Sequence, residues 1–216
     1  MIEKGARWTQ KHITTDMWHG MSEKMIWDEF KRGNNDALVF IYNKYFSTLF
    51  SYAIRFCPDR ELVKDIIQDL FVYLYKTRKS INSTTSIKFY LFKCLKRRTI
   101  AELKKIKPLQ VDIYPMSWEM SSESMFIHAE DEKTKTRLLQ LAIEKLSPKQ
   151  QEIIYYIYYQ NFSYSEASAI MGFSQPKSAR KLLYRALNTL KKEVGMYDIF
   201  LYIFVANLIH QSYFLK

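Results

Sequence analysis

The sequence predicts an all-α protein made of two small helical domains joined by an acidic, flexible linker. Only five Gly and five Pro occur in 216 residues, far fewer than many-turned β proteins or Rossmann-type folds use. Apolar residues make up 48 % of the chain and recur at intervals of three and four, which places them on one face of a helix. This apolar content is sufficient for a folded core and excludes global disorder.

The first predicted domain covers residues 25–107. Apolar residues at helical spacing run through residues 38–53 and again through residues 62–74, and a third helix is expected from about Ile87. Asp59 follows a Cys-Pro pair and is suited to cap the helix that comes after it, because its side chain can accept backbone N–H bonds. These features predict a compact group of helices.

The remaining segments differ in composition. Residues 1–24 are polar and lack periodicity, which indicates an N-terminal extension. Residues 108–134 contain two prolines and five acidic residues between Glu119 and Glu132, with no Lys or Arg among them, as expected for a linker. Helical periodicity returns over a second domain, residues 135–195, and an apolar tail follows at residues 196–216.

A helix-turn-helix is predicted in the second domain. Ser163 and Glu166 have the spacing of a capping box, and Gly172 can take the positive φ of a tight turn. Ser174 is expected to cap a second, longer helix with Pro176 in its first turn. In this motif the N-terminal side chains of the second helix contact base edges in the major groove of DNA.

The formal net charge of +11 and the isoelectric point near 9.4 favour a polyanionic partner, either nucleic acid or an anionic membrane surface. The positive charge is concentrated on two predicted helices. The second helix of the motif has no acidic residue before Glu193, and residues 88–107 carry eight Lys and Arg against the single acid Glu102, with aromatic residues among them. This segregation favours nucleic acid, because cations bind phosphates and aromatic rings stack on unpaired bases.

The second domain resembles region 4 of the sigma-70 family over the run LSPKQQEIIYYIYYQNFSYSEASAIMGFSQPKSARKLLYRALNTLKK. The resemblance implies recognition of the −35 promoter element. Two departures occur: Ala167-Ser168 replaces the usual Ile-Ala, and the recognition helix has one additional residue between Ser174 and Arg185. The residues expected to contact the −35 element are Ser174, Gln175, Lys177, Ser178, Arg180, Lys181 and Arg185.

The first domain resembles sigma region 2, through FKRGNNDALVFIYNKYFSTLFSYA and ELVKDIIQDLFVYLY. In the second of these runs Asp65, Gln68 and Asp69 share one helix face, and the resemblance implies that this face binds the clamp helices of core RNA polymerase. It also implies that the basic helix recognises and opens the −10 element, although Lys-Arg-Arg replaces the usual Ala-Arg-Asn. The expected contacts are Lys88, Tyr90, Lys93, Lys96, Arg97 and Arg98.

No region 3 fits between the two domains, so the resemblance is to the extracytoplasmic-function (ECF) group of sigma factors. It implies a cytoplasmic protein that directs core polymerase to specific promoters; the alternative is a helix-turn-helix regulator that binds DNA without polymerase. No P-loop, GxGxxG or HExxH motif is present, and we expect no enzyme activity, small-molecule substrate, cofactor or metal.

The tail contains eight consecutive apolar residues, Ile199–Ala206, whereas a membrane-spanning helix needs about 20. We expect it to fold back on one of the domains or to be covered by an anti-sigma protein, and only indirect contact with a membrane. Neutralising the linker acids Glu130, Asp131 and Glu132 is expected to change initiation or promoter escape more than promoter binding.

Overall fold

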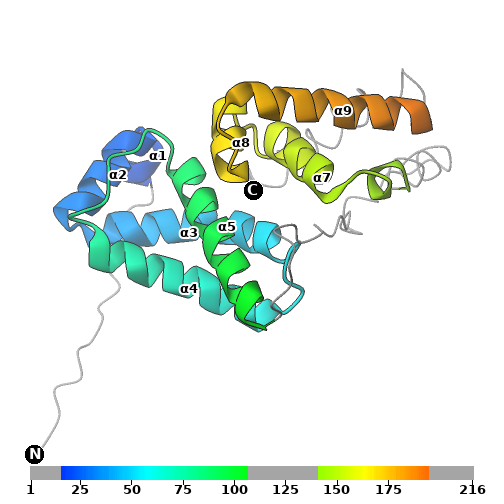
Figure 1. Ribbon diagram of the computed structural model, residues 1–216. Helices are drawn as coiled ribbons and strands as arrows, with labels where there is room; N and C mark the ends of the chain where they lie inside the picture. Colours follow the sequence, from blue (N-terminus) through cyan, green and yellow to red (C-terminus); the bar gives the residue numbers. More distant parts are fainter. Residues whose placement is uncertain (1–15, 107–140, 195–216) are drawn as a thin grey trace, which may run out of the picture.

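A computed structural model describes residues 16–106 and 141–194. All elements in these ranges are helices, which confirms the all-α prediction (Figure 1). They are α1 (Asp16–His19), α2 (Glu23–Arg32), α3 (Asn35–Ala53), α4 (Arg60–Thr77), α5 (Ile87–Ile106), α7 (Pro148–Ile154), the π-helix η2 (Tyr155–Tyr159), α8 (Tyr164–Met171) and α9 (Pro176–Val194). The acidic linker, the apolar run and the predictions made for them lie outside the described residues.

Local signals in the sequence mark the ends of the first-domain helices. Asn34 caps α3 by accepting hydrogen bonds from the backbone N–H of residues 36 and 37. Asp59 caps α4, as predicted, by accepting from the N–H of residues 61 and 62. Gly33 ends α2 with φ of 102°, a left-handed conformation that glycine adopts without a steric penalty. These caps fix the end of α2 and the starts of α3 and α4.

The first domain begins before residue 25. α1 lies within the segment expected to be a polar extension, and Trp18 in it is buried against the ring of Phe40, with 6.0 Å between ring centroids. Glu23 accepts a hydrogen bond from the backbone N–H of Ile87 at 2.7 Å and so caps the start of α5 from a different helix. Trp18 stabilises the packing of this polar segment on the domain, because its ring buries a large apolar area.

The core of the first domain lies between α3, α4 and α5. Leu49, Ile67, Leu70 and Leu91 are fully buried there, one or two from each helix. Ile26, Trp27 and Phe30 of α2 are buried alongside them. Most apolar positions of α3 and α4 face this core, as their spacing predicted, whereas Val39 and Tyr42 of α3 and Val72 of α4 are exposed.

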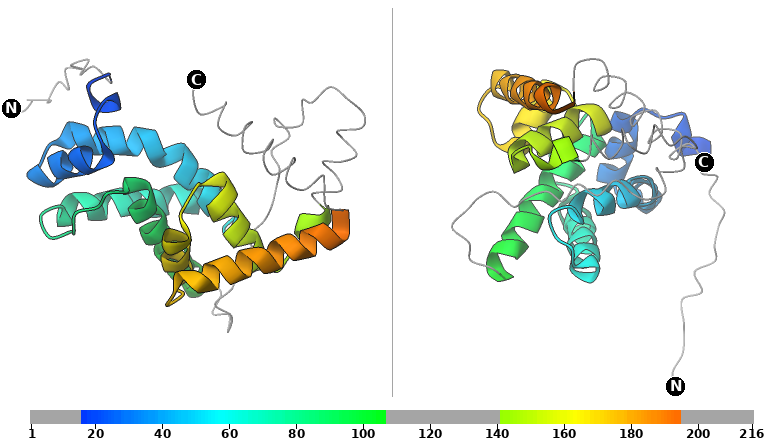
Figure 2. Two further views of the ribbon diagram at one scale, coloured as in Figure 1. Left: turned by 90° about the horizontal axis from the view of Figure 1, so that it is seen from above. Right: turned by 90° about the vertical axis from the view of Figure 1, so that its right-hand side faces the viewer.

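In the second domain α7 and α8 pack against α9, and η2 contacts α7 and α8 (Figure 1). Ser147 opens α7 with a reciprocal capping box in which Gln150 accepts from the N–H of Ser147. α7 continues directly into the five-residue π-helix η2, and the two views of Figure 2 place this part of the second domain beside α3 and α5 of the first. Helices α5 and α8 are in direct contact.

Candidate nucleic-acid and polymerase interface

The predicted helix-turn-helix consists of α8, a short turn and α9. Both bonds of the capping box are present: the backbone N–H of Glu166 donates to Ser163 Oγ at 3.2 Å, and Ser163 N–H donates to Glu166 Oε2 at 2.9 Å. Gly172 ends α8 with φ of 75°, and its N–H donates to the carbonyl of Ser168. The sequence signals for the first helix and the turn are confirmed.

Ser168 holds the turn between the two helices. Its side chain is buried, and Oγ donates to the carbonyl oxygens of Gln175 at 2.9 Å and Phe173 at 3.4 Å. Alanine, the usual residue of the family at this position, could make neither bond. Ser168 thus adds a tie between α8 and the start of α9, and Ala167 beside it is fully buried.

The start of α9 differs from the prediction by one residue. Its first residue is Pro176, so Gln175 and not Ser174 directly precedes the helix, and the Gln175 carbonyl accepts from the N–H of Ser178 at 3.0 Å. Proline in the first position fixes this start, because it has no N–H to satisfy and its φ already suits a helix. Ser174 and Gln175 are exposed in the turn.

One side of α9 is basic and the other is apolar. Lys177, Arg180, Lys181 and Arg185 are exposed, and Ser178 is half-buried. The opposite side holds the predicted core residues: Leu183, Ala186 and Leu190 are buried, and Leu182 and Leu187 are half-buried. The four cations therefore lie on a surface that a DNA duplex can reach.

Tyr184 is an exposed aromatic residue on this basic side that sequence reasoning missed. Its hydroxyl lies 3.3 Å from Arg180 Nη2, and the guanidinium lies 5.5 Å from the centre of the ring. The i, i+4 spacing of the two residues was the available signal, since side chains four apart on a helix are neighbours.

The residues expected to contact the −10 element divide into two groups on α5. Arg97 is exposed, whereas Lys93, Arg98 and Tyr90 are half-buried. The guanidinium of Arg98 stacks 4.6 Å from the ring centre of Tyr73 on α4. These four side chains form the accessible group, and Leu91, Phe92 and Leu95 between them belong to the core.

The second group, Lys88 and Lys96, is directed to the second domain. Lys88 Nζ donates to the carbonyl oxygen of Gln160 at 2.9 Å, and desolvation by burial lowers the pKa of Lys88 to about 8. Lys96 Nζ lies 2.5 Å from Glu152 Oε1, and only 13 % of the Lys96 side chain is exposed. Sequence reasoning did not anticipate either contact.

The surface expected to bind polymerase lies on α4. Asp65, Gln68 and Asp69 are all exposed, on the side opposite the buried Val63, Ile67, Leu70 and Leu74. Val72 follows at the same helical spacing and is 41 % exposed, so an apolar side chain extends the face. Acidic, amide and apolar groups side by side suit a protein partner better than DNA.

Neither a metal site nor a membrane span is found in the part of the chain that the structure describes. Within residues 16–106 and 141–194, no three His, Cys, Asp or Glu side chains are grouped closely enough to bind a metal ion. In the same residues no helix combines the length and apolar character needed to cross a membrane.

Comparisons with known proteins agree with the two-domain organisation. The family model "Sigma-70 region 2" matches residues 41–107, and the model "Sigma-70, region 4" matches residues 136–190. The chain is 26 % identical to the RNA polymerase sigma factor YlaC of Bacillus subtilis over 169 residues, 74 % of this chain and 94 % of YlaC. A solved structure of CnrH in complex with the cytosolic domain of CnrY has a similar fold, with a TM-score of 0.53 and 17 % identity, covering 80 % of this chain and 96 % of that one.

Proposed function

This chain belongs to the sigma-70 family, as a member of its ECF group, and from that premise we propose which surfaces carry its activity. It is an RNA polymerase sigma factor that binds core polymerase and DNA and directs promoter-specific transcription initiation; it is not an enzyme. The observation that carries this function is the presence of both sigma regions in order on one chain. A regulator that binds DNA without polymerase would not need sigma region 2.

We assign core-polymerase binding to the exposed face of α4 and promoter contacts to α9 and α5. Exposure and charge support the assignment: the α4 face is acidic, whereas α9 and the accessible group on α5 are basic. The first domain, which extends beyond the predicted 25–107 to include α1 and Glu23, is the proposed unit for the −10 element, and residues 135–195 are the proposed unit for the −35 element. Because core polymerase is a cytoplasmic enzyme in bacteria, we also propose a cytoplasmic location for this chain.

Reversing one charge on the α4 face is expected to weaken binding to core polymerase about tenfold or more, since a like charge placed in an interface is repelled. The variants are Asp65→Lys and Asp69→Lys, both at exposed positions of α4. Affinity for core polymerase would be measured by fluorescence anisotropy of the labelled full-length protein. Helical content by circular dichroism should not change.

The matched control is Glu144→Lys, which reverses an exposed carboxylate on the second domain. It changes the net charge of the protein by the same amount and is expected to leave core affinity unaltered. If Asp65→Lys and Asp69→Lys bind core as well as the unmodified protein does, the α4 face is not the polymerase contact.

Replacing Arg180 by alanine is expected to cost about 1–3 kcal/mol at one base position of the −35 element, the usual value of an arginine that pairs with guanine. The measurement is transcription by the reconstituted holoenzyme from a promoter library. Arg185→Ala serves as the comparison, because it should weaken binding to all −35 sequences alike. An unchanged base preference in Arg180→Ala would contradict the assignment of the recognition face.

An anti-sigma protein is a further proposed partner. CnrH, whose fold is similar, was solved in complex with the cytosolic domain of CnrY. The full-length chain would be co-expressed and purified with a candidate anti-sigma protein. The purified mixture should not support transcription by core polymerase in vitro. Full activity of the mixture would exclude that candidate.

A further inference from the structure

We propose that the two domains hold each other in a closed, inactive arrangement, in which the second domain covers two lysines that the first domain needs for promoter DNA. The covered side chains are Lys88 and Lys96 of α5. This inference rests on the proposed assignment of α5 to the −10 element. It concerns the free protein and names an internal contact as the inhibitor.

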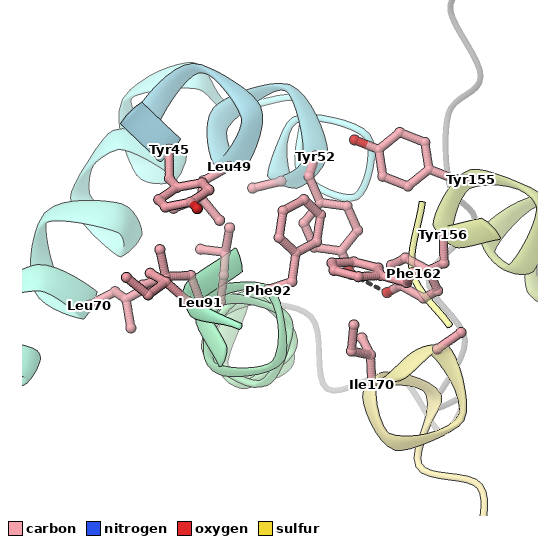
Figure 3. Close-up of a cluster of buried hydrophobic side chains, with 14 of the residues drawn as sticks. Tyr45, Leu49, Tyr52, Leu70, Leu91, Phe92, Tyr155, Tyr156, Phe162 and Ile170 are labelled. Atoms are coloured by element: carbon pink, nitrogen blue, oxygen red, sulfur yellow. Dashed lines mark hydrogen bonds between the residues drawn. The ribbon is translucent and has the colours of Figure 1, made fainter. Parts of the chain in front are cut away.

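An aromatic cluster joins the domains. Tyr52 of α3 and Phe92 of α5 come from the first domain; Tyr155 and Tyr156 of η2, together with Phe162, come from the second (Figure 3). The ring of Tyr52 is stacked on Tyr155 with 5.7 Å between centroids, and Phe92 meets Phe162 edge-on at 5.2 Å. Tyr52, Tyr156 and Phe92 are fully buried, so this is a packed interface and not a surface encounter.

A chain of polar contacts crosses the aromatic cluster and ends on Lys96. The hydroxyls of Tyr52 and Tyr156 lie 2.5 Å apart, and Tyr156 donates to Glu152 Oε1 at 2.6 Å. The same carboxylate oxygen lies 2.5 Å from Lys96 Nζ. Buried polar groups of this kind are costly to leave without partners, so the network specifies one relative position of the two domains.

Glu152 occupies the place that a DNA phosphate would take on Lys96. A lysine ammonium bound to a buried carboxylate, with 13 % of its side chain exposed, is not free to bind the sugar–phosphate backbone as well. Lys88 is likewise occupied, by the Gln160 carbonyl and by the ring of Phe162 at 5.4 Å. DNA binding by these two lysines therefore requires that the second domain move away.

The distance between promoter elements leads to the same conclusion. The −10 and −35 elements are about 25 base pairs apart, which is roughly 85 Å at 3.4 Å per base pair. In the closed arrangement α5 directly contacts α8, the first helix of the helix-turn-helix. The two domains cannot recognise both elements while in contact, so initiation requires the open arrangement.

The populations of the two arrangements can be measured by double electron–electron resonance on the full-length protein. Spin labels would be placed at Lys64→Cys on α4 and Asn188→Cys on α9, two exposed positions, with Cys94→Ser as the background and the buried Cys57 retained. A single narrow distance is expected for the free protein, and a longer distance after addition of core polymerase. A broad distribution in the free protein would overturn the proposal.

Release of the lysines can be tested by the affinity of the free protein for labelled single-stranded oligo(dT). Glu152→Gln removes the charge that holds Lys96 and is expected to raise this affinity about tenfold, equivalent to about 1.4 kcal/mol. Glu144→Gln, at an exposed site on the same domain, makes the same change in net charge and should raise affinity no more than about twofold. Equal effects of the two variants would refute the proposal.

A second variant covers the case in which Glu152→Gln fails to fold. Tyr156→Phe keeps the ring but deletes both hydroxyl contacts, and should also increase oligo(dT) affinity and shift the distance distribution to longer values. If both measurements match those of the unmodified protein, the closed state is not held by this network. The proposed function fails separately, if the unmodified protein with core polymerase gives no promoter-specific transcription. Closure of the free protein does not predict that result, because core polymerase is expected to open the protein.

Discussion

Trp27→Ala is expected to lower the free energy of unfolding of the first domain by about 3–5 kcal/mol. Trp27 is fully buried, its ring lies 5.3 Å from Phe30 and 4.9 Å from Tyr90, and its indole N–H donates to the carbonyl of Asn82 at 3.0 Å. The substitution removes the transfer free energy of the ring, leaves a cavity and breaks the tie to the loop before α5. Urea denaturation followed by circular dichroism would measure the loss.

Two comparisons make the measurement specific. Trp27→Phe keeps part of the ring but loses the bond to Asn82, so its cost should fall between those of the unmodified protein and Trp27→Ala. Val39→Ala, at a residue that is 57 % exposed on α3, should change stability by less than about 0.5 kcal/mol. Hydrogen–deuterium exchange should rise in α2–α5 in Trp27→Ala. A loss below about 1 kcal/mol would contradict the assigned core role.

Raising the pH above 10 is expected to open and unfold the protein steeply. Burial raises the pKa of Tyr155 to about 12, and raises the pKa values of Tyr52 and Tyr156 well above the usual value of 10. These residues bind protons more tightly in the closed, folded state, so the stability they contribute is present below pH 10 and is lost as the pH rises above it. Three such groups lower the free energy of unfolding by up to about 4 kcal/mol per pH unit.

Lys88 has the opposite effect on the free energy of unfolding, at lower pH. Its pKa of about 8 lies below the usual 10.5, so the folded state binds fewer protons there than the unfolded state, and this contribution favours folding as the pH rises from 8 to 10. Urea denaturation at pH 8, 10 and 11 tests both signs. The free energy of unfolding of Tyr52→Phe should fall less steeply above pH 10 than that of the unmodified protein, because one ionising group is gone. If the free energies of the two proteins fall equally steeply with pH, burial of Tyr52 is not a cause of the loss.

Those parts of the fold that depend on neighbouring residues could be predicted from the sequence. Asp59 caps α4, the capping box of Ser163 opens α8, and Gly172 takes the left-handed turn, because each signal acts within four residues. The basic side of α9 and the exposed face of α4 follow from helical periodicity alone. In these places local chemistry and tertiary packing require the same arrangement.

Contacts between distant segments could not be predicted in this way. Tyr52 and Tyr156 are 104 residues apart, and nothing near either residue indicates that their hydroxyls meet. Lys96 was assigned to DNA because it lies in a basic run, but Glu152, its partner, lies in the other domain. Trp18 was placed in a polar extension because the apolar residues of this segment do not recur at helical spacing. Such pairings arise from the docking of complete helices.

The separation of 104 residues between Tyr52 and Tyr156 also determines when their contact can form during synthesis of the protein. A ribosome adds about 5–20 residues per second, so Tyr156 is made roughly 5–20 s after Tyr52. Helices α2–α5 are complete about halfway through that interval, since α5 ends at Ile106, and Glu152 and Gln160 are made only after them. During synthesis, Lys88 and Lys96 of the nascent chain are therefore exposed to nucleic acid, and they become covered only when the second half of the protein emerges.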